Sequence, residues 1–169
     1  MAERPVVRRA RPGDAGALVA LAEAIASEPG GWLISDGAWR SPGEERRFLR
    51  ALRRYDDAAV FVAELPEGLV GRLSLGRDSH PASRHVADLG LMVAAGHRRR
   101  GIGTALLAAA VEWARAAEVR KLELHVFPHN DAAIGLYEQF GFRQEGLRKG
   151  HYRRGAEYLD AILMAYIVQ

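Results

Sequence analysis

Apolar residues in the first third of the chain recur at the spacing of amphipathic helices. Alanine and leucine positions from Ala15 to Ala26 follow a helical period, and Asp14 is placed as the N-cap of that helix. A second helix is predicted to begin at Pro42, because Ser41 is a favoured N-cap residue and proline is favoured at the first helical position. The segment 27–41 between them holds several glycines and two tryptophans, and it is predicted to be a loop.

The rest of the chain mixes strand-like and helix-like patterns. Two β-like runs, Ala58–Glu64 and Leu69–Leu75, are joined by Pro-Glu-Gly and predict a hairpin. The other predicted elements are an extended run over Pro5–Arg9, strands over His85–Val93 and Leu122–Phe127, helices over Gly103–Ala117 and Asn130–Phe140, and closing strands over Phe142–Arg148 and Tyr158–Val168. Strands first and strand–helix alternation later indicate an α/β (α+β) fold, with helices on the faces of a mixed sheet.

The composition fits a single domain spanning residues 1–169. Of these residues, 49% are hydrophobic and 27% are charged, and no low-complexity tract or long linker divides the chain. The absence of cysteine excludes a disulfide scaffold, a Cys-ligated zinc site and a thiolate nucleophile, and no metal site is expected. No apolar run reaches the length of a membrane span, so we expect a soluble cytoplasmic protein without a membrane partner.

The charge balance does not indicate a nucleic-acid partner. The net charge is +3, and 24 basic residues are offset by 21 acidic ones that are spread along the chain. The run Arg98–Arg100 lacks the interleaved aromatic residues and the broad basic face that single-strand binding requires. We therefore expect no nucleic-acid partner.

One turn combines glycines, arginines and a helix start. A strand ending at Val93 is followed, after a short connection, by Arg98, Arg99, Arg100, Gly101, Ile102, Gly103 and Thr104, and then by an apolar helix. The first-turn amides of a helix are unpaired and its dipole favours an anion there, so the turn predicts a cradle for a pyrophosphate. The spacing matches neither a Walker A loop nor the dinucleotide fingerprint. The alternative is a helix that begins with glycines for close packing and carries solvated arginines.

A second motif covers residues 130–142. Asn130 is placed as a helix cap and Gly141 as the glycine that ends the helix. Packing alone accounts for the apolar positions between them. Asn130 and Tyr137 nevertheless bring polar atoms to a helix one strand beyond the predicted cradle.

Together the two motifs resemble those of the Gcn5-related N-acetyltransferase (GNAT) superfamily. The residues that carry the resemblance are Arg98, Gly101 and Gly103 in the first motif, and Asn130, Ala133, Leu136, Tyr137, Gly141 and Phe142 in the second. The similarity extends over nearly the whole chain. The segments 85–90 and 145–164 look similar to a bacterial branch that includes L-amino-acid N-acetyltransferases, although related endings occur in ribosomal-protein and polyamine acetyltransferases.

The resemblance implies a GNAT fold and acetyl-CoA as co-substrate. That fold has a mostly antiparallel sheet of about six to seven strands flanked by about four helices. Its fourth and fifth strands, here Asp88–Val93 and Leu122–Phe127, splay apart to form the CoA cleft. The family pattern assigns the pantetheine chain to the strand backbone at Leu91, Met92 and Val93, and the pyrophosphate to the turn 98–104, with Asn130 and Tyr137 nearby.

The implied reaction is direct attack of a primary amine on the thioester in a ternary complex. Strand amides near Met92 are expected to stabilise the oxyanion, and Tyr137 is the phenol matched to protonation of the thiolate. The alternative for Tyr137 is a packing role that positions the sulfur. Asp88 is the preferred general base, because a charged residue inside a central strand is costly unless it is paired or used. Glu123, His85 and His125 are the other candidates.

The acceptor is predicted to be a free amino acid with an apolar side chain. Trp32 and Trp39 lie in the predicted loop that the resemblance places on the acceptor side, although either can instead anchor the core. Arg77 and Arg84 are candidate ligands for the acceptor carboxylate, with a solvated surface pair as the alternative. Acceptors left open are a ribosomal-protein N-terminus and a polyamine. A silent acyl-CoA-binding module disagrees with the retention of the second motif, and a homodimer remains open.

Overall fold

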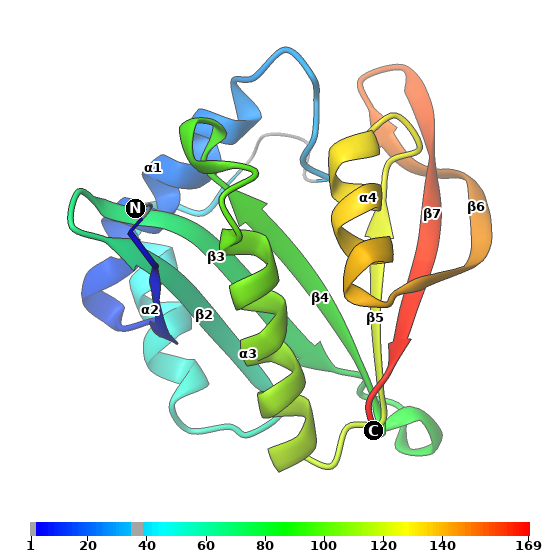
Figure 1. Cartoon of the computed structure of the whole chain (residues 1–169), viewed down its shortest axis with the longest axis horizontal. Helices are drawn as coiled ribbons and strands as arrows, with labels where there is room; N and C mark the ends of the chain where they lie inside the picture. The colour runs from blue at the N-terminus through cyan, green and yellow to red at the C-terminus, as the bar shows by residue number, and fades with distance from the viewer. Residues whose placement is uncertain (1–2, 35–38) are drawn as a thin grey trace.

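One mixed sheet organises the computed structural model, which describes residues 3–34 and 39–169 (Figure 1). Within these residues the sheet has seven strands in the order β1-β2-β3-β4-β5-β7-β6, and only the β4–β5 pair is parallel. The strands are β1 (Val6–Arg9), β2 (Ala58–Leu65), β3 (Gly68–Arg77), β4 (Val86–Val93), β5 (Lys121–Val126), β6 (Arg143–Arg154) and β7 (Glu157–Ile167).

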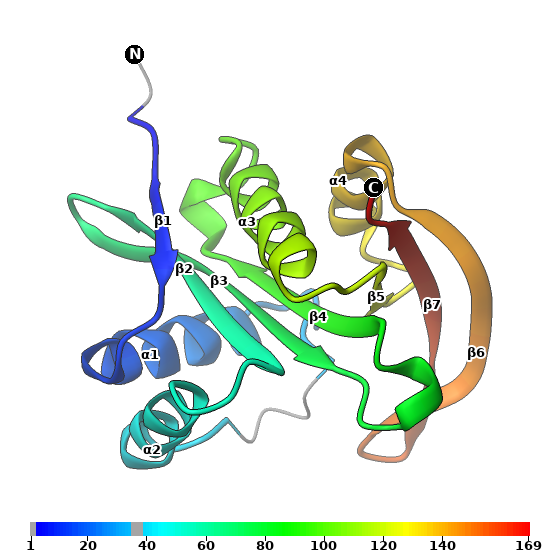
Figure 2. The ribbon, with the colours of Figure 1, turned by 90° about the horizontal axis from the view of Figure 1, so that it is seen from below.

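Helices cover both faces of the sheet, as the sequence predicts (Figure 2). Helices α1 (Ala15–Ala26) and α2 (Pro42–Leu52) lie on one face, and α3 (Ile102–Ala116) and α4 (Asp131–Phe140) lie on the other. Three short 3-10 turns span Pro12–Asp14, Pro81–Ser83 and Ala95–His97. The main core lies between the sheet and the α3–α4 layer, and two smaller clusters lie beneath α1 and α2. No helix in the described ranges is both long and apolar enough to cross a membrane.

Most helix boundaries follow the predicted caps. Ser41 and Glu44 form a reciprocal capping box at the start of α2, and Gly141 ends α4 with a φ of 121° that favours glycine. Asp14 departs from the prediction, because its carboxylate does not cap α1. It instead accepts hydrogen bonds from the Arg8 guanidinium at 2.8 and 3.0 Å and from the Arg11 amide at 2.7 Å.

The last hairpin is longer than predicted. The strand expected to end at Arg148 continues to Arg154, and the chain turns at Gly155 with a φ of 58°. The pairing between β6 and β7 shifts register between Arg148 and Tyr152. This irregularity interrupts the two-residue alternation, which is why the pattern of apolar residues did not reveal the second half of β6.

Strands β4 and β5 separate soon after they begin. They pair only at Val86–Lys121, Ala87–Leu122 and Asp88–Glu123. Beyond this point β4 stays with β3 as far as Val93, while β5 stays with β7. The two strands therefore open into a V (Figure 1), which confirms the splayed strands that the resemblance implied.

Candidate active site

The open edge of β4 presents unpaired backbone groups to the gap. Even-numbered residues of β4 bond to β3, since the amide of Ala94 donates to the Val70 carbonyl and the Val86 carbonyl accepts from Asp78. In an antiparallel ladder the alternate residues point the other way, so the backbones of Leu89, Leu91 and Val93 face the gap. Beyond the paired stretch with β5, these groups are available to an extended ligand, except for the Val93 carbonyl, which accepts from Nε of Arg98.

This alternation corrects the prediction for Met92. Its backbone belongs to the ladder with β3, where it lies opposite Arg72, and is not directed into the gap. Its side chain is buried against Leu21, Ala22 and Ile25 of α1. The backbone amides near the gap that can stabilise an oxyanion are therefore those of its neighbours on β4.

The first turn of α3 leaves amides unpaired close to the end of β4. Gly101 has a φ of 78°, and a Cβ placed there would meet open space. The amides of Ile102, Gly103 and Thr104 have no acceptor within the described residues, because they precede the first intrahelical bond. Their aligned N–H groups make this turn suitable for an anionic group.

The two glycines of this turn have different roles. Gly101 provides the left-handed conformation, which other residues adopt only with strain. At Gly103, a Cβ would lie 2.6 Å from Cδ2 of Leu136, so this glycine allows α3 to pack closely against α4. Close packing of α3 against α4 therefore explains Gly103, whereas the left-handed backbone conformation explains Gly101.

The side chain of Arg98 is held within the protein. Its Nη1 and Nη2 each donate to the Glu28 carboxylate at 2.7 Å, and its Nε donates to the Val93 carbonyl at 3.0 Å. The hydrogen bonds from Arg98 hold the pKa of Glu28 below its usual value. The guanidinium therefore connects the segment after α1 to the end of β4, and these three bonds use three of its five N–H groups. Arg99 and Arg100 remain exposed.

The second motif places a buried phenol beside the α3–α4 core. Asn130 caps α4, because its Oδ1 accepts from the Ala133 amide at 3.2 Å. Tyr137 is 6% exposed, and its ring packs against Phe142 with a centroid separation of 5.6 Å. Burial raises the pKa of the Tyr137 phenol, so it stays protonated well above neutral pH. A protonated phenol is a competent proton donor.

Asp88 lies on the opposite face of the sheet, the face covered by α1 and α2. Its side chain forms no hydrogen bond or ion pair within the described residues and is exposed at the point where β4 and β5 separate. Partial desolvation by the surrounding protein raises the pKa of the Asp88 carboxyl to about 6, and the charge of Glu123 raises it further while that of Arg148 lowers it. A carboxylate with this pKa is ionised at neutral pH and is also a stronger base than an ordinary aspartate.

A histidine–tyrosine pair lies on the same face. Nδ1 of His125 is 2.6 Å from the phenol oxygen of Tyr152, which belongs to the unpredicted half of β6. Burial, together with Arg148 and His151, lowers the pKa of His125, so the imidazole is neutral at pH 7. Glu123, the other acidic candidate, is 3.1 Å from the ammonium of Lys121. Of the two carboxylates at the vertex of the V, Asp88 is therefore the one without a cation bonded to it in the described residues.

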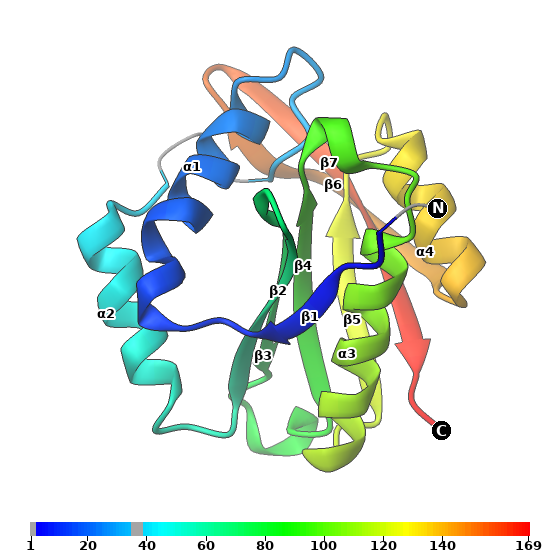
Figure 3. The same ribbon diagram turned by 60° about the vertical axis from the view of Figure 1, so that its left-hand side comes forward.

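The segment after α1 bridges the two sides of the V (Figure 3). The carbonyls of Gly31 and Leu33 accept from Arg154 of β6, the latter at 2.7 Å. The Trp32 ring stacks on His129 at 5.6 Å, and its indole N–H donates to Glu28 at 2.9 Å. The bridge therefore connects the β4 side, through Glu28, with the β5–β7 side. Residues 35–38 of the predicted acceptor loop lie outside the described residues.

The comparisons with known proteins match this geometry to one family. The model of the Acetyltransferase (GNAT) family matches residues 18–142. The chain belongs to the GNAT acetyltransferase family. It is 33% identical over 137 residues to the L-amino acid N-acetyltransferase AaaT of Escherichia coli, covering 79% of this chain and 77% of that protein.

Two further relatives show the breadth of the family. The [ribosomal protein bS18]-alanine N-acetyltransferase of Salmonella typhimurium is 38% identical over 68 residues, which are 40% of this chain and 46% of that protein. The crystal structure of a GNAT acetyltransferase from Streptococcus pneumoniae superposes with a TM-score of 0.87 at 28% identity, covering 98% of this chain and 99% of that one. The chain is thus an N-acetyltransferase with acetyl-CoA as its co-substrate, acting on a small-molecule or protein amine.

Arg77 and Arg84 do not lie where a GNAT acceptor carboxylate was expected. Arg77 pairs in register with Ala87 near the start of β4, six residues before the end of the open edge. Its guanidinium donates to the carbonyls of Arg84 and Ala117. Nη2 of Arg84 lies 2.6 Å from the Asp57 carboxylate. Both arginines therefore stabilise the closed end of the sheet, and the prediction that they bind the acceptor is wrong.

A buried ion pair beneath α2 was missed. Glu45 is 0% exposed and accepts from Arg72 of β3 at 2.6 Å and from Arg40 at 2.7 Å. The sequence contains one indication of this pair. Arg72 lies inside the apolar run Leu69–Leu75, and a buried charge is costly unless it is paired. Its partner lies on a helix 27 residues earlier, and the periodicity of α2 alone did not identify it.

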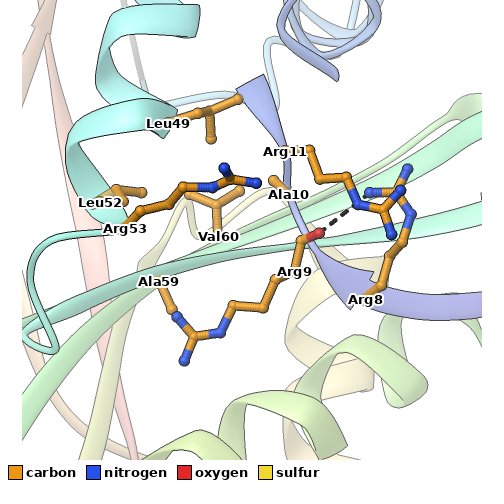
Figure 4. Close-up of a pocket in the computed structure, with 9 residues that line it drawn as sticks. All are labelled: Arg8, Arg9, Ala10, Arg11, Leu49, Leu52, Arg53, Ala59 and Val60. Carbon is orange, nitrogen blue, oxygen red and sulfur yellow. Dashed lines mark hydrogen bonds between the residues drawn. The ribbon is translucent and has the colours of Figure 1, made fainter. Parts of the chain in front are cut away.

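An arginine-rich recess lies elsewhere on the molecule, away from the V between β4 and β5. It has a volume of about 240 Å³ and lies between β1 and the end of α2 (Figure 4). Arg8, Arg9, Arg11 and Arg53 contribute to its lining. Strand β3 separates this recess from the open edge of β4, so it takes no part in the site described above.

Proposed function

We propose that the protein transfers the acetyl group of acetyl-CoA to the α-amine of a free amino acid. The observation that carries the proposal is the arrangement around the open edge of β4. Gap-facing backbone and unpaired helix amides lie near its carboxyl end, a buried phenol lies on one face, and an unpaired carboxylate lies on the other. This arrangement supports binding of donor and acceptor from opposite faces of the sheet.

The donor side is formed by the two sequence motifs. The backbone of residues 98–104 would hold the pyrophosphate, because the amides of Ile102, Gly103 and Thr104 lack acceptors and Gly101 leaves open space. The pantetheine would bond to the gap-facing backbones of Leu91 and Val93. Asn130 would position this chain through its amide nitrogen, since its oxygen already caps α4.

The chemistry requires one base and one acid. Asp88 would take a proton from the acceptor ammonium, directly or through water, and the free amine would then attack the thioester carbonyl. The amide of Leu91 or Val93 would stabilise the developing oxyanion. As the new C–N bond forms and the C–S bond breaks, the attacking nitrogen would lose its second proton to water and Tyr137 would donate its proton to the sulfur. Water would then reprotonate the tyrosinate. The products are the N-acetylated amino acid and CoA.

The acceptor class rests on the extent of the similarity and on the local charge. The match to an L-amino acid N-acetyltransferase spans 79% of this chain, whereas the ribosomal-protein relative matches 40%. The acceptor face also carries Arg148 and Arg154, while a polyamine requires an acidic cleft. The bridge of residues 28–33 favours a small acceptor over a protein N-terminus. A silent binding module would need neither the unpaired Asp88 nor the buried Tyr137.

The decisive experiment measures CoA release with three kinds of amine. Free L-amino acids, a polyamine and a peptide with an N-terminal alanine are compared at equal concentration with acetyl-CoA. We expect at least one apolar amino acid to have the highest kcat/KM. Turnover of only the polyamine or the peptide would refute the amino-acid assignment, and binding of acetyl-CoA without turnover of any amine would favour the silent module.

A further inference from the structure

A cluster of aromatic and charged side chains lies on the acceptor face. Arg72 of β3 lies directly opposite Met92 of β4, two pairs beyond Ser74–Gly90 toward the open end. Its side chain lies on the same face of the sheet as that of Asp88, because residues 88, 90 and 92 of β4 all point to one side. Trp39 packs in the same apolar cluster as Met92, and its ring lies 5.1 Å from the Arg72 guanidinium carbon.

The cluster contains two guanidinium groups and one carboxylate. Glu45 accepts from both Arg72 and Arg40. The Arg72 side chain is 4% exposed and the Glu45 side chain is 0% exposed. The Arg40 side chain is 44% exposed, so water solvates its charge, and the buried Arg72–Glu45 pair is balanced. Phe48, 4.1 Å from the Arg40 guanidinium carbon, covers the outer side of the cluster.

The cluster also has hydrogen-bond donors without acceptors. The indole Nε1 of Trp39 is buried and has no partner among residues 3–34 and 39–169. Arg72 donates to Glu45 through Nη1 alone, which leaves its Nε and Nη2 without a protein acceptor in the part of the chain that the structure describes. A buried donor is rarely left unpaired in native proteins, so the Trp39 indole indicates a ligand that supplies an acceptor atom. A carboxylate has two acceptor oxygens, one for this indole and one for the unbonded edge of the Arg72 guanidinium 5.1 Å from the Trp39 ring.

We propose that Arg72 and Trp39 bind the carboxylate of the acceptor amino acid. The inference rests on the proposed function and gives it a specificity determinant in place of Arg77 and Arg84. The planar guanidinium of Arg72 presents its free N–H groups to the carboxylate, and the Trp39 N–H adds a neutral donor beside it. Glu45 acts as a positioning residue, because its hydrogen bond from Nη1 fixes the orientation of the Arg72 guanidinium.

The test compares substrates that differ only in the carboxylate. The best L-amino acid is paired with its carboxamide, in which an uncharged amide replaces the carboxylate and the α-amine is kept. Wild-type enzyme is expected to prefer the acid by tenfold or more in kcat/KM. In Trp39→Phe and Arg72→Lys, KM for the acid should rise about tenfold while KM for the carboxamide and for acetyl-CoA stays the same. Arg72→Lys keeps the charge opposite Glu45, and Trp39→Phe keeps the ring.

Arg84→Ala is the matched control, because it removes an arginine that is paired with Asp57 at the closed end of the sheet. It should leave the preference for the acid unchanged. Thermal unfolding of each variant verifies that the fold is retained, and if Arg72→Lys does not fold, Trp39→Phe alone decides. Equal kcat/KM for acid and carboxamide in the wild type, or an unchanged preference in a folded variant, would overturn the inference while leaving the proposed function intact.

Failure of the proposed function has a different signature. If the wild type acetylates no amine at all, calorimetry of the free amino acid and its carboxamide still tests the carboxylate site without turnover. Binding of the acid that weakens in Trp39→Phe would support the site. Equal binding of acid and carboxamide, or no binding of either, would overturn it.

Discussion

The burial of Tyr137 affects both roles that the residue can have. The phenol is enclosed by the α3–α4 core, and this burial raises its pKa. The phenol therefore keeps its proton at neutral pH, but a raised pKa also makes it a weaker acid, so burial by itself does not favour proton transfer to the thiolate. The same burial also fits a residue that only packs, so the two roles must be separated by kinetics.

We expect Tyr137→Phe to lower kcat by about a hundredfold or more, because a proton donor is lost in the transition state. The Kd for acetyl-CoA should change by about fivefold or less, equivalent to ~1 kcal/mol for one lost hydrogen bond. Steady-state kinetics and calorimetry measure the two quantities. Tyr158→Phe, which alters an exposed tyrosine, is the control. A kcat that is unchanged in Tyr137→Phe would show that this residue has only a packing role.

Asp88 is expected to control the acidic limb of the pH profile. Its pKa of about 6 is raised, so the carboxylate is the active form above this pH, and kcat/KM should fall as the pH drops through 6. Asp88→Asn should lower kcat/KM by about a hundredfold or more and remove this limb. Glu123→Gln should move the limb to lower pH, because the charge of Glu123 helps to raise the pKa of Asp88. A limb that does not move in either variant would assign the base to another group.

At the scale of elements, the start of α3 combines two demands. Gly103 allows α3 to approach α4, while the neighbouring amides remain unpaired because a helix cannot satisfy its own first turn. One short segment thus serves both packing and anion binding. Substituting Gly103 would therefore mix the two effects, and an exposed position is a cleaner probe.

Thr104→Glu should weaken acetyl-CoA binding by about tenfold or more, because a carboxylate would stand beside the predicted pyrophosphate position. The fold should tolerate the change, since Thr104 is exposed and an acidic side chain is favourable in the first turn of a helix. Ala108→Glu, one turn further along the same exposed face, is the matched control and should bind normally. Equal affinities of the two variants, measured by calorimetry, would move the pyrophosphate away from this turn.

At the scale of the whole molecule, the two sides of the V share little backbone pairing. Strands β4 and β5 meet over three residue pairs, and the segment after α1 provides a second connection across the open end. Its contacts are made by side chains and carbonyls and not by a continuous ladder. Such a connection opens more easily than a sheet, which suits a wall of a site that admits substrate.

Arg154→Ala removes the bonds to the carbonyls of Gly31 and Leu33. We expect faster amide exchange in residues 28–34, equivalent to about 1 to 2 kcal/mol of local opening free energy, and a several-fold higher KM for the acceptor. Arg153→Ala is the control, because that side chain bonds only to Gly155 within its own hairpin. Hydrogen exchange that is unchanged in Arg154→Ala would show that the bridge holds without this residue.

The sequence by itself determined the features that depend on interactions between residues close together in the chain. The caps at Ser41 and Asn130, the glycines at 101 and 141, and the alternation of Asp88 with Met92 all follow from interactions within a few residues. The two motifs, read together, also indicated the family. These features needed no knowledge of which distant segments meet.

Only the tertiary structure decided the partners of the charged side chains. Arg98 binds Glu28 across 70 residues, Arg72 binds Glu45 across 27, and Tyr152 reaches His125 past an irregularity in β6. The sequence shows that an arginine is present but not which carboxylate lies within reach, because ion pairing depends on strand register and on helix packing. For this reason the pattern suggested Arg77 and Arg84 for the acceptor, whereas the fold engages them elsewhere and leaves unused donors on Arg72.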